Sequence, residues 1–139
     1  MRPIALFACL ALAETATSRP ALPTLNPAQA ISRAAASAKP VRALFQFRVA
    51  RAAKSRDGLY LDSEKDFRSP ANLGIVIRTS AMPGLTQKFG ANLQAAFLGR
   101  TLKLIGRVSH RSVGGKAGAA AAIATEIEVT HAGQILSVT

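Results

Sequence analysis

The sequence predicts a mainly β domain, a small five-stranded barrel with a helix between its third and fourth strands, preceded by a signal peptide and a disordered linker. Two patterns lead to this fold: apolar residues alternate with polar ones in short stretches, and the spacing changes to four in one central segment. Helices do not separate every pair of strands, which argues against a parallel α/β sheet. A chain of 139 residues has room for one such domain.

The first 13 residues have the features of an export signal. Arg2 provides a positive start, residues 4–13 are uncharged and almost wholly apolar, and the run ends in Ala-Leu-Ala. A ten-residue helix spans roughly 15 Å, about half of a bilayer core, so no integral membrane span is expected. We therefore expect a signal peptide over residues 1–13 and a periplasmic or secreted protein; a buried N-terminal helix is the alternative.

Residues 14–44 are predicted to be an Ala/Pro-rich linker. Large apolar residues are sparse there, so the segment cannot offset its ordering entropy with a core of its own. Asn26 could cap a helix, Pro27 suits its first position, and residues 28–38 permit a helix, but one this short is marginal alone. The expectation is a tether with a fluctuating helix; a docking arm for a partner is the alternative.

The folded domain is expected over residues 45–139 and begins with a three-stranded meander. Apolar residues alternate over 45–50, Asp57-Gly58 is a strong turn signal, and residues 59–61 form a second short strand. After a polar loop, residues 73–77 form the third.

A helical segment follows the meander. Its apolar stripe has a spacing of four and consists of Leu85, Phe89, Leu93 and Phe97. We expect a helix over 81–89 that Ser80 could cap, and a shorter one over 92–98 that Asn92 could cap.

Two strands complete the predicted sheet. Residues 102–105 form the fourth, with a bulge at Gly106, and residues 126–129 form the fifth. Between them, residues 109–122 are rich in Gly and Ala and are expected to be a long flexible loop. Residues 135–138 are expected to return to the barrel edge.

This order of elements suits the OB-fold, because closing the sheet buries the alternating faces and removes most exposed edges. Four stretches resemble secreted bacterial OB-fold proteins: Leu59–Arg68, Leu73–Ile77, Leu98–Val108 and Glu126–Ile135. The resemblance implies a nucleic-acid-binding type of barrel in exported, mostly uncharacterised proteins, and it carries no catalytic residue over.

The excess of positive charge indicates a binding partner. Eighteen lysines and arginines against seven acids give a net charge of +11, which favours polyanions through counterion release. The alternative is an ordinary solvated basic surface. OB-fold ligands usually cross the second and third strands between flanking loops. The candidate residues are cations near that face and two rings that could stack a base: Arg48, Lys54, Arg56, Tyr60, Phe67, Arg107, Arg111 and Lys116.

No catalytic, metal or cofactor site is expected. Asp62, Glu64 and Asp66 share a face in extended chain but lack the calcium-loop pattern, so salt bridges and turn contacts are expected there. The two histidines belong to no close cluster of ligands. The sequence therefore favours an exported, non-enzymatic protein that binds a polyanion such as single-stranded nucleic acid. An envelope adaptor that contacts another protein and a divergent barrel nuclease are the alternatives.

Overall fold

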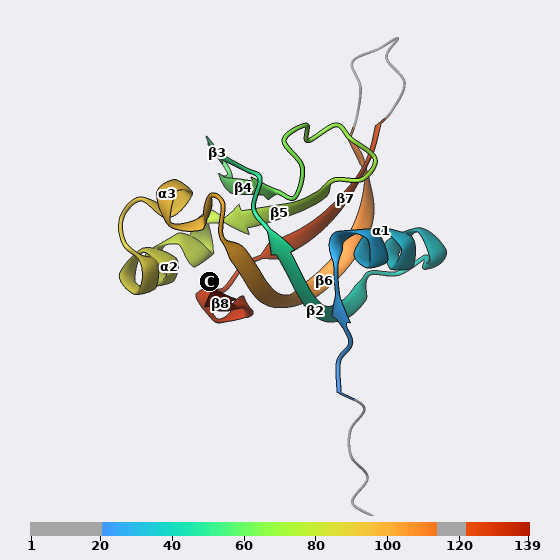
Figure 1. The fold of residues 1–139 in the computed structure, drawn as a ribbon, viewed down its shortest axis with the longest axis horizontal. Helices are drawn as coiled ribbons and strands as arrows, with labels where there is room; N and C mark the ends of the chain where they lie inside the picture. The colour runs from blue at the N-terminus through green and yellow to red at the C-terminus, as the bar shows by residue number, and fades with distance from the viewer. Residues whose placement is uncertain (1–20, 114–121) are drawn as a thin grey trace, which may run out of the picture.

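The computed structural model describes residues 21–113 and 122–139, and over these ranges the chain is a mixed α/β structure made mostly of strands (Figure 1). The strands are β1 (Thr24–Leu25), β2 (Val41–Arg48), β3 (Arg51–Ser55), β4 (Gly58–Asp62), β5 (Leu73–Arg78), β6 (Thr101–Val113), β7 (Ala122–Val129) and β8 (Ile135–Val138). The helices are α1 (Pro27–Ala36), α2 (Met82–Phe89) and α3 (Leu93–Phe97), with short 3-10 turns at Thr79–Ala81 and Ala132–Gln134. The predicted signal peptide and Lys116 lie outside the described residues.

The strands form one eight-stranded mixed sheet with the order β1-β2-β6-β7-β5-β4-β3, and β8 pairs with β6. The β1–β2 and β5–β7 pairs are parallel, and the other pairs are antiparallel. This hydrogen-bonded order does not close, so the expectation of a closed five-stranded barrel is corrected to an eight-stranded mixed sheet.

The break in the sheet falls within the strand predicted over residues 45–50. Val49 and Ala50 separate β2 from β3, and their backbone bonds go to different neighbours. Val49 exchanges bonds with Gly99 and Arg100, whereas Ala50 donates to Asp62. Consequently β2 pairs with β6, and β3, which lies beyond the predicted strand, pairs with β4.

The predicted second and third strands and the predicted helices are confirmed, but the strand that pairs with β4 is β3 and not the strand predicted over residues 45–50. The β3–β4 and β4–β5 pairs are antiparallel, and α2 and α3 lie where the apolar stripe placed them. Asn92 caps α3 by accepting a hydrogen bond from the backbone N–H of Ala95 at 3.2 Å. Ser80 does not cap α2, because its hydroxyl donates to the Thr130 carbonyl at 2.9 Å.

Strand β6 is longer than expected. Residues 109–113, assigned to a loop by composition, belong to β6 and pair with β7. Gly106 makes no bulge against β2, since it pairs in register with Ala43, and the irregularity lies between Lys103 and Leu104, against β8. A Cβ at Gly106 would lie 2.8 Å from a methyl group of Ile127, so the glycine permits β6 and β7 to approach closely.

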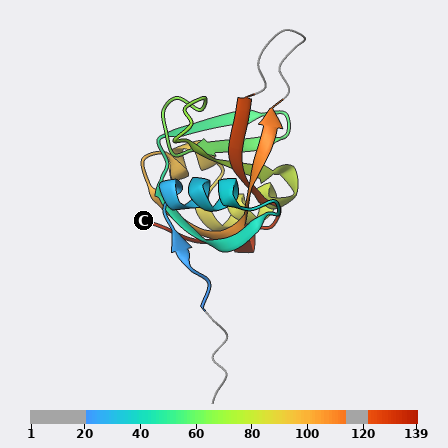
Figure 2. The ribbon, with the colours of Figure 1, turned by 90° about the vertical axis from the view of Figure 1, so that its right-hand side faces the viewer.

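Residues 24–44 are folded, which corrects the expected disordered linker over this part. Asn26 caps α1, as the sequence indicated: its side chain accepts from the backbone N–H of Gln29 at 2.9 Å. The Gln29 side chain accepts from the backbone N–H of Asn26 at 3.0 Å, which completes a capping box. Leu25, Ala30 and Ala34 are buried, and α1 contacts β2, β5 and β6. The alanine face gives the helix a close tertiary contact, which stabilises a segment that would be marginal alone. Figure 2 shows α1 lying across one end of the sheet.

The hydrophobic core lies between the sheet and the helices that cover its two ends. Helix α1 covers one end of the sheet, and α2 with α3 covers the other (Figure 1). Phe89 and Phe97 meet edge to face with ring centroids 5.5 Å apart. The largest buried side chains come from the strands and from α2 and α3: Phe45, Phe97, Leu59, Leu61, Leu73, Ile75, Ile77, Leu85, Leu93, Leu102, Leu104 and Ile127. Among the described residues, no helix combines the length and apolar character needed to cross a membrane.

The packing of α1 predicts unequal effects of the same substitution on two of its faces. Ala30→Gln places a polar amide in a fully buried position and should lower the free energy of unfolding by more than about 2 kcal/mol. Ala35→Gln, on the exposed face, is the matched control and should change it by less than about 0.5 kcal/mol. Urea unfolding followed by circular dichroism measures both, and equal effects would contradict the docking of α1.

The turn between β3 and β4 predicts that the same Gly→Ala substitution lowers stability much more at one glycine than at another. Gly58 has φ of +138°, and a Cβ there would overlap the backbone carbonyl of Ile77. Gly58→Ala should therefore lower the free energy of unfolding by at least about 2 kcal/mol. At Gly133 a Cβ would meet nothing within 4 Å, so Gly133→Ala is the control. Similar melting temperatures for the two variants would argue against this hairpin geometry.

Candidate functional site

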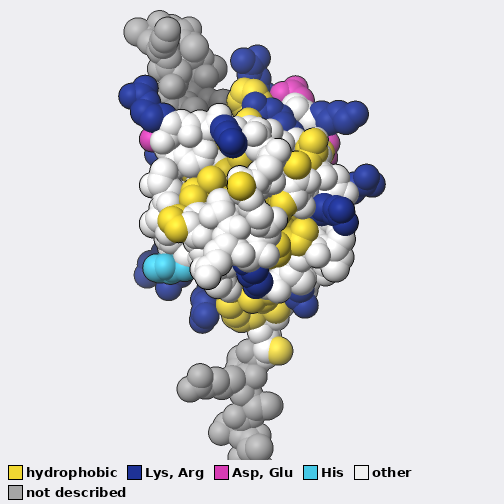
Figure 3. Space-filling model, turned by 90° about the vertical axis from the view of Figure 1, so that its left-hand side faces the viewer, with side chains coloured by type: hydrophobic (Ala, Val, Ile, Leu, Met, Phe, Trp, Pro, Cys, Tyr) yellow, Lys and Arg dark blue, Asp and Glu magenta, His cyan; other side chains and the backbone are white. Residues whose placement is uncertain are grey.

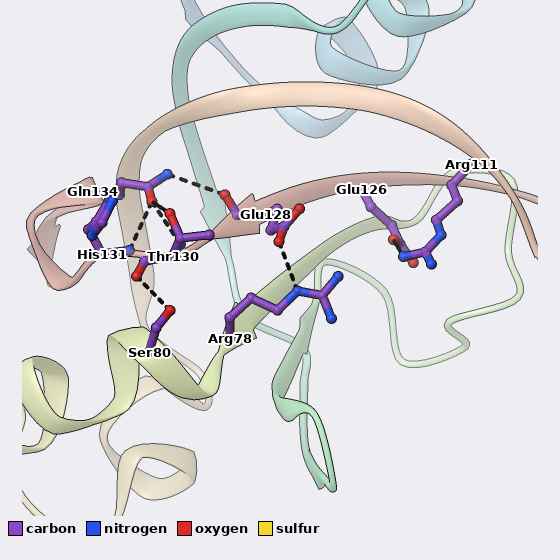
Figure 4. Close-up of polar contacts among 8 residues, drawn as sticks. All are labelled: Arg78, Ser80, Arg111, Glu126, Glu128, Thr130, His131 and Gln134. Atoms are coloured by element: carbon purple, nitrogen blue, oxygen red, sulfur yellow. Dashed lines mark hydrogen bonds and ion pairs between the residues drawn. The ribbon is translucent and has the colours of Figure 1, made fainter.

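An open groove of about 810 Å³ crosses the outer face of β2, β6, β7 and β5. Alternate residues of these strands point away from the core, so side chains from four neighbouring strands meet on this face. Four arginines and two glutamates are among the residues that line it: Arg42, Arg78, Arg107, Arg111, Glu126 and Glu128. Figure 4 shows the residues along β7 and beside it.

The two glutamates of β7 are each paired with an arginine of a neighbouring strand. The Nε of Arg78 donates to Oε1 of Glu128 at 2.9 Å, and Nη1 of Arg111 lies 3.8 Å from Oε2 of Glu126. The hydrogen bond to Glu128 raises the pKa of Arg78 above its ordinary value, and burial opposes this only in part. Along β7, each glutamate of the groove therefore has an arginine partner, and these partly exposed ion pairs contribute little to stability.

The β2–β6 side of the groove carries charges that are not matched. Arg42 and Arg107 are register partners in adjacent antiparallel strands, and both side chains are exposed. Neither forms an ion pair within residues 21–113 and 122–139. Cβ atoms of directly opposed residues lie about 4.5–5.5 Å apart, and like charges in such positions repel. Among the described residues, this pair is consequently the part of the groove where positive charge has no carboxylate partner.

Gln134 holds together the end of the groove near the 3-10 turn. Its Oε1 accepts from the backbone N–H groups of Thr130 and His131 at 2.8 and 3.1 Å. Its Nε2 donates to the carbonyls of Ile105 and Glu128, both at 3.2 Å. One amide therefore ties β6, the end of β7 and the turn to each other, and Figure 4 shows its contacts with β7 and the turn.

Only part of the predicted set of binding residues lies on the groove. Arg107 and Arg111 line it, although Arg111 belongs to β6 rather than to a loop. Lys54 lies in β3, not in a loop, and Arg56 lies in the tight turn that follows. Half-buried Tyr60 pairs with Val76, one of the lining residues.

Arg48 lies away from the groove, at the far end of β2. There it lines a smaller hollow of about 350 Å³ together with Lys65 and Leu98. Figure 3 shows the face that carries α2 and α3, where lysines and arginines surround the margin and apolar atoms are scattered between them. Positive charge does not gather at the centre of that face.

Phe67 lies in the loop between β4 and β5, with half of its surface exposed. The guanidinium carbons of Arg51 and Arg68 lie 4.8 and 5.3 Å from its ring centroid. The ring therefore makes cation–π contacts within its own part of the structure and does not line the groove.

The expected salt bridges and turn contacts of the acidic segment are present. Buried Asp62 pairs with Arg51 at 2.8 Å and accepts from Asn72 at 3.0 Å. Asp66 accepts from the backbone N–H of Arg68 at 2.9 Å. Within the part of the chain that the structure describes, no three His, Cys, Asp or Glu side chains cluster as metal ligands would.

The sequence analysis missed Arg42, Arg78, Glu126 and Glu128 as site residues. Arg42 fell in the presumed linker, although the alternation of residues 45–50 continues back to Val41 and could have revealed it. The pairing of Arg78 with Glu128 depends on the parallel register of β5 and β7, which no local pattern indicates.

The comparisons with known proteins give no family. No protein-family model matches this chain, and no curated protein matches it. Among solved structures, the chain is similar to a putative aspartyl-tRNA synthetase from Leishmania major Friedlin, with 13% sequence identity and a TM-score of 0.47. The match covers 84% of this chain and 21% of that chain, so this protein spans about a fifth of the synthetase's length.

The bonding of Gln134 predicts a structural role at the groove. Gln134→Ala leaves the backbone groups at Thr130, Ile105 and Glu128 without their partner and should lower the free energy of unfolding by about 1–3 kcal/mol. Gln134→Glu keeps the acceptor for Thr130 but sets a carboxylate oxygen against the carbonyls of Ile105 and Glu128, so it should also destabilise the protein. Chemical denaturation of both variants tests this, and an alanine variant as stable as the parent would contradict it.

Proposed function

We propose that this chain is an exported, non-enzymatic polyanion-binding protein, and that its groove binds single-stranded nucleic acid. The observation that carries the proposal is the groove itself. It collects four arginines and two glutamates from four neighbouring strands, which leaves an excess of positive charge on a concave surface. Such a surface attracts polyanions by counterion release and requires no base sequence.

The order of the elements supports an OB-type topology as the framework, with the sheet left open. Strands β2 and β3 are consecutive halves of one bent segment, and they pair with β6 and β4 at opposite ends of the sheet order. The bend at Val49 and Ala50 therefore lets one continuous segment of chain take part at both ends of the sheet order. The helical segment between β5 and β6 has the position expected from the resemblance to secreted OB-fold proteins.

We place the ligand on β2, β6, β7 and β5 rather than across β4 and β5. Strand β4 contains neither lysine nor arginine, and β5 contributes Arg78 alone. The face first expected to bind is consequently poor in charge, whereas β2 and β6 add Arg42, Arg107 and Arg111 to the groove.

Binding without catalysis is favoured by how the carboxylates of the groove are used. Metal-assisted cleavage of a phosphodiester needs carboxylates that hold a divalent ion. Glu126 and Glu128 instead pair with arginines. Export is proposed from the apolar run and small-residue pattern of residues 1–13, and a periplasmic or secreted location follows from it.

The test is binding of a fluorescent single-stranded DNA oligomer, measured by anisotropy at several salt concentrations. Affinity should fall as salt rises, and the logarithm of the binding constant should fall with the logarithm of the salt concentration by about 0.7 for each phosphate neutralised. A variant with all four groove arginines changed to Gln should bind at least tenfold more weakly than the parent. Incubation of the same oligomer with Mg²⁺ or Ca²⁺ should leave it intact.

The matched control removes the same charge elsewhere, with Arg33, Arg56, Lys88 and Arg100 changed to Gln. These four exposed residues do not line the groove, so the control should keep most of the affinity. Absence of binding at low salt would overturn the proposal, and so would equal losses in the two variants. Cleavage of the DNA would overturn its non-enzymatic part.

A further inference from the structure

We propose that Arg42 and Arg107 form a phosphate-binding pair, and that Glu126 and Glu128 make the groove selective for a strand with charge along one side. The ligand would be single-stranded nucleic acid, with its backbone over β2 and β6 and its bases toward β7. This inference rests on the proposed function. It adds how the nucleic acid strand is oriented in the groove and how the groove discriminates between polyanions.

The first step is the register of the two arginines. Arg42 and Arg107 lie opposite one another within an uninterrupted eight-pair ladder, so the strands hold them side by side on the outer face. Both are exposed, and no carboxylate of the described residues pairs with either of them. Opposed like charges weaken a strand pair, and an anion bound between them removes the repulsion.

The second step is the contrast with the other two arginines of the groove. Arg78 is already hydrogen-bonded to Glu128, and Arg111 already lies beside Glu126. A phosphate that bound either arginine would have to compete with a carboxylate. The pair on β2 and β6 has no such competitor among the described residues, so it is the preferred phosphate position.

The third step is the effect of the two carboxylates. Glu126 and Glu128 line the groove with side chains that are 23% and 55% exposed. They repel a chain that carries charge on every side, such as polyphosphate. They can accept hydrogen bonds from the exocyclic amines of bases, as carboxylates do from the amine of cytosine. A nucleic acid strand has charge along one side and such amines along the other, and polyphosphate does not.

The first experiment compares two double variants with equal net charge, Arg42→Gln with Arg107→Gln and Arg33→Gln with Lys88→Gln. Binding of an oligo-dC strand is measured by anisotropy across salt. The first variant should bind at least tenfold more weakly than the parent. The slope of its log affinity against log salt should be about 1.4 shallower, since two phosphate contacts disappear. The second should stay within threefold of the parent. Equal losses of affinity in the two variants would overturn the phosphate-binding pair. The proposed function would still stand if the parent binds the strand.

The second experiment tests the carboxylates with oligo-dC and polyphosphate of equal charge. The parent should bind oligo-dC at least fivefold more tightly than polyphosphate. The double variant Glu126→Gln with Glu128→Gln should narrow that gap by binding polyphosphate more tightly. Equal affinity of the parent for both polyanions would overturn the discrimination, and circular dichroism would verify that each variant is folded. A parent that binds no DNA fails the proposed function itself.

Discussion

Strand β6 is the element on which the rest of the structure depends. Its thirteen residues pair with β2, β7 and β8, so three ladders share one backbone. Leu102, Leu104 and Val108 point inward and are fully buried, whereas Arg107 and Arg111 point outward into the groove. Because side chains alternate along a strand, a shift of one residue in this register would exchange the two sets. Burial of the leucines therefore also determines where the arginines lie.

The groove differs from an ordinary basic surface because its charges are arranged by strand. The carboxylates on β7 pair with arginines from β5 and β6, and the exposed arginines on the β2–β6 side have no carboxylate partner among the described residues. Exposed ion pairs contribute little to stability, so the arrangement has more consequence for what the surface attracts than for how firmly the sheet folds. Under the function that we propose, this surface distinguishes ligands by where their charge lies as well as by how much charge they carry.

Helix α1 shows how tertiary contact changes the meaning of a local pattern. The cap formed by Asn26 and the proline that follows it are visible in the sequence, and the structure confirms the helix they indicate. Its isolated stability is low, because ten residues with small side chains bury little by themselves. Contact with β2, β5 and β6 supplies the missing burial. Arg42, farther along the same predicted linker, lies in a strand instead of a tether because β2 pairs with β6.

The sequence by itself determined the elements whose signals are local. These are the antiparallel β4–β5 pair, the helical stripe from Leu85 to Phe97, the cap at Asn92 and the turn at Gly58, because backbone preference and residue spacing act over a few positions. Tertiary structure decided that β3, and not the first predicted strand, pairs with β4. It also decided the length of β6, the docking of α1 and the composition of the groove. Each of these depends on which strands become neighbours, and Arg78 meets Glu128 across fifty residues of chain. Of the predicted binding residues, Arg107 and Arg111 reach the groove because β6 continues past Gly106, where a small residue allows two strands to approach closely.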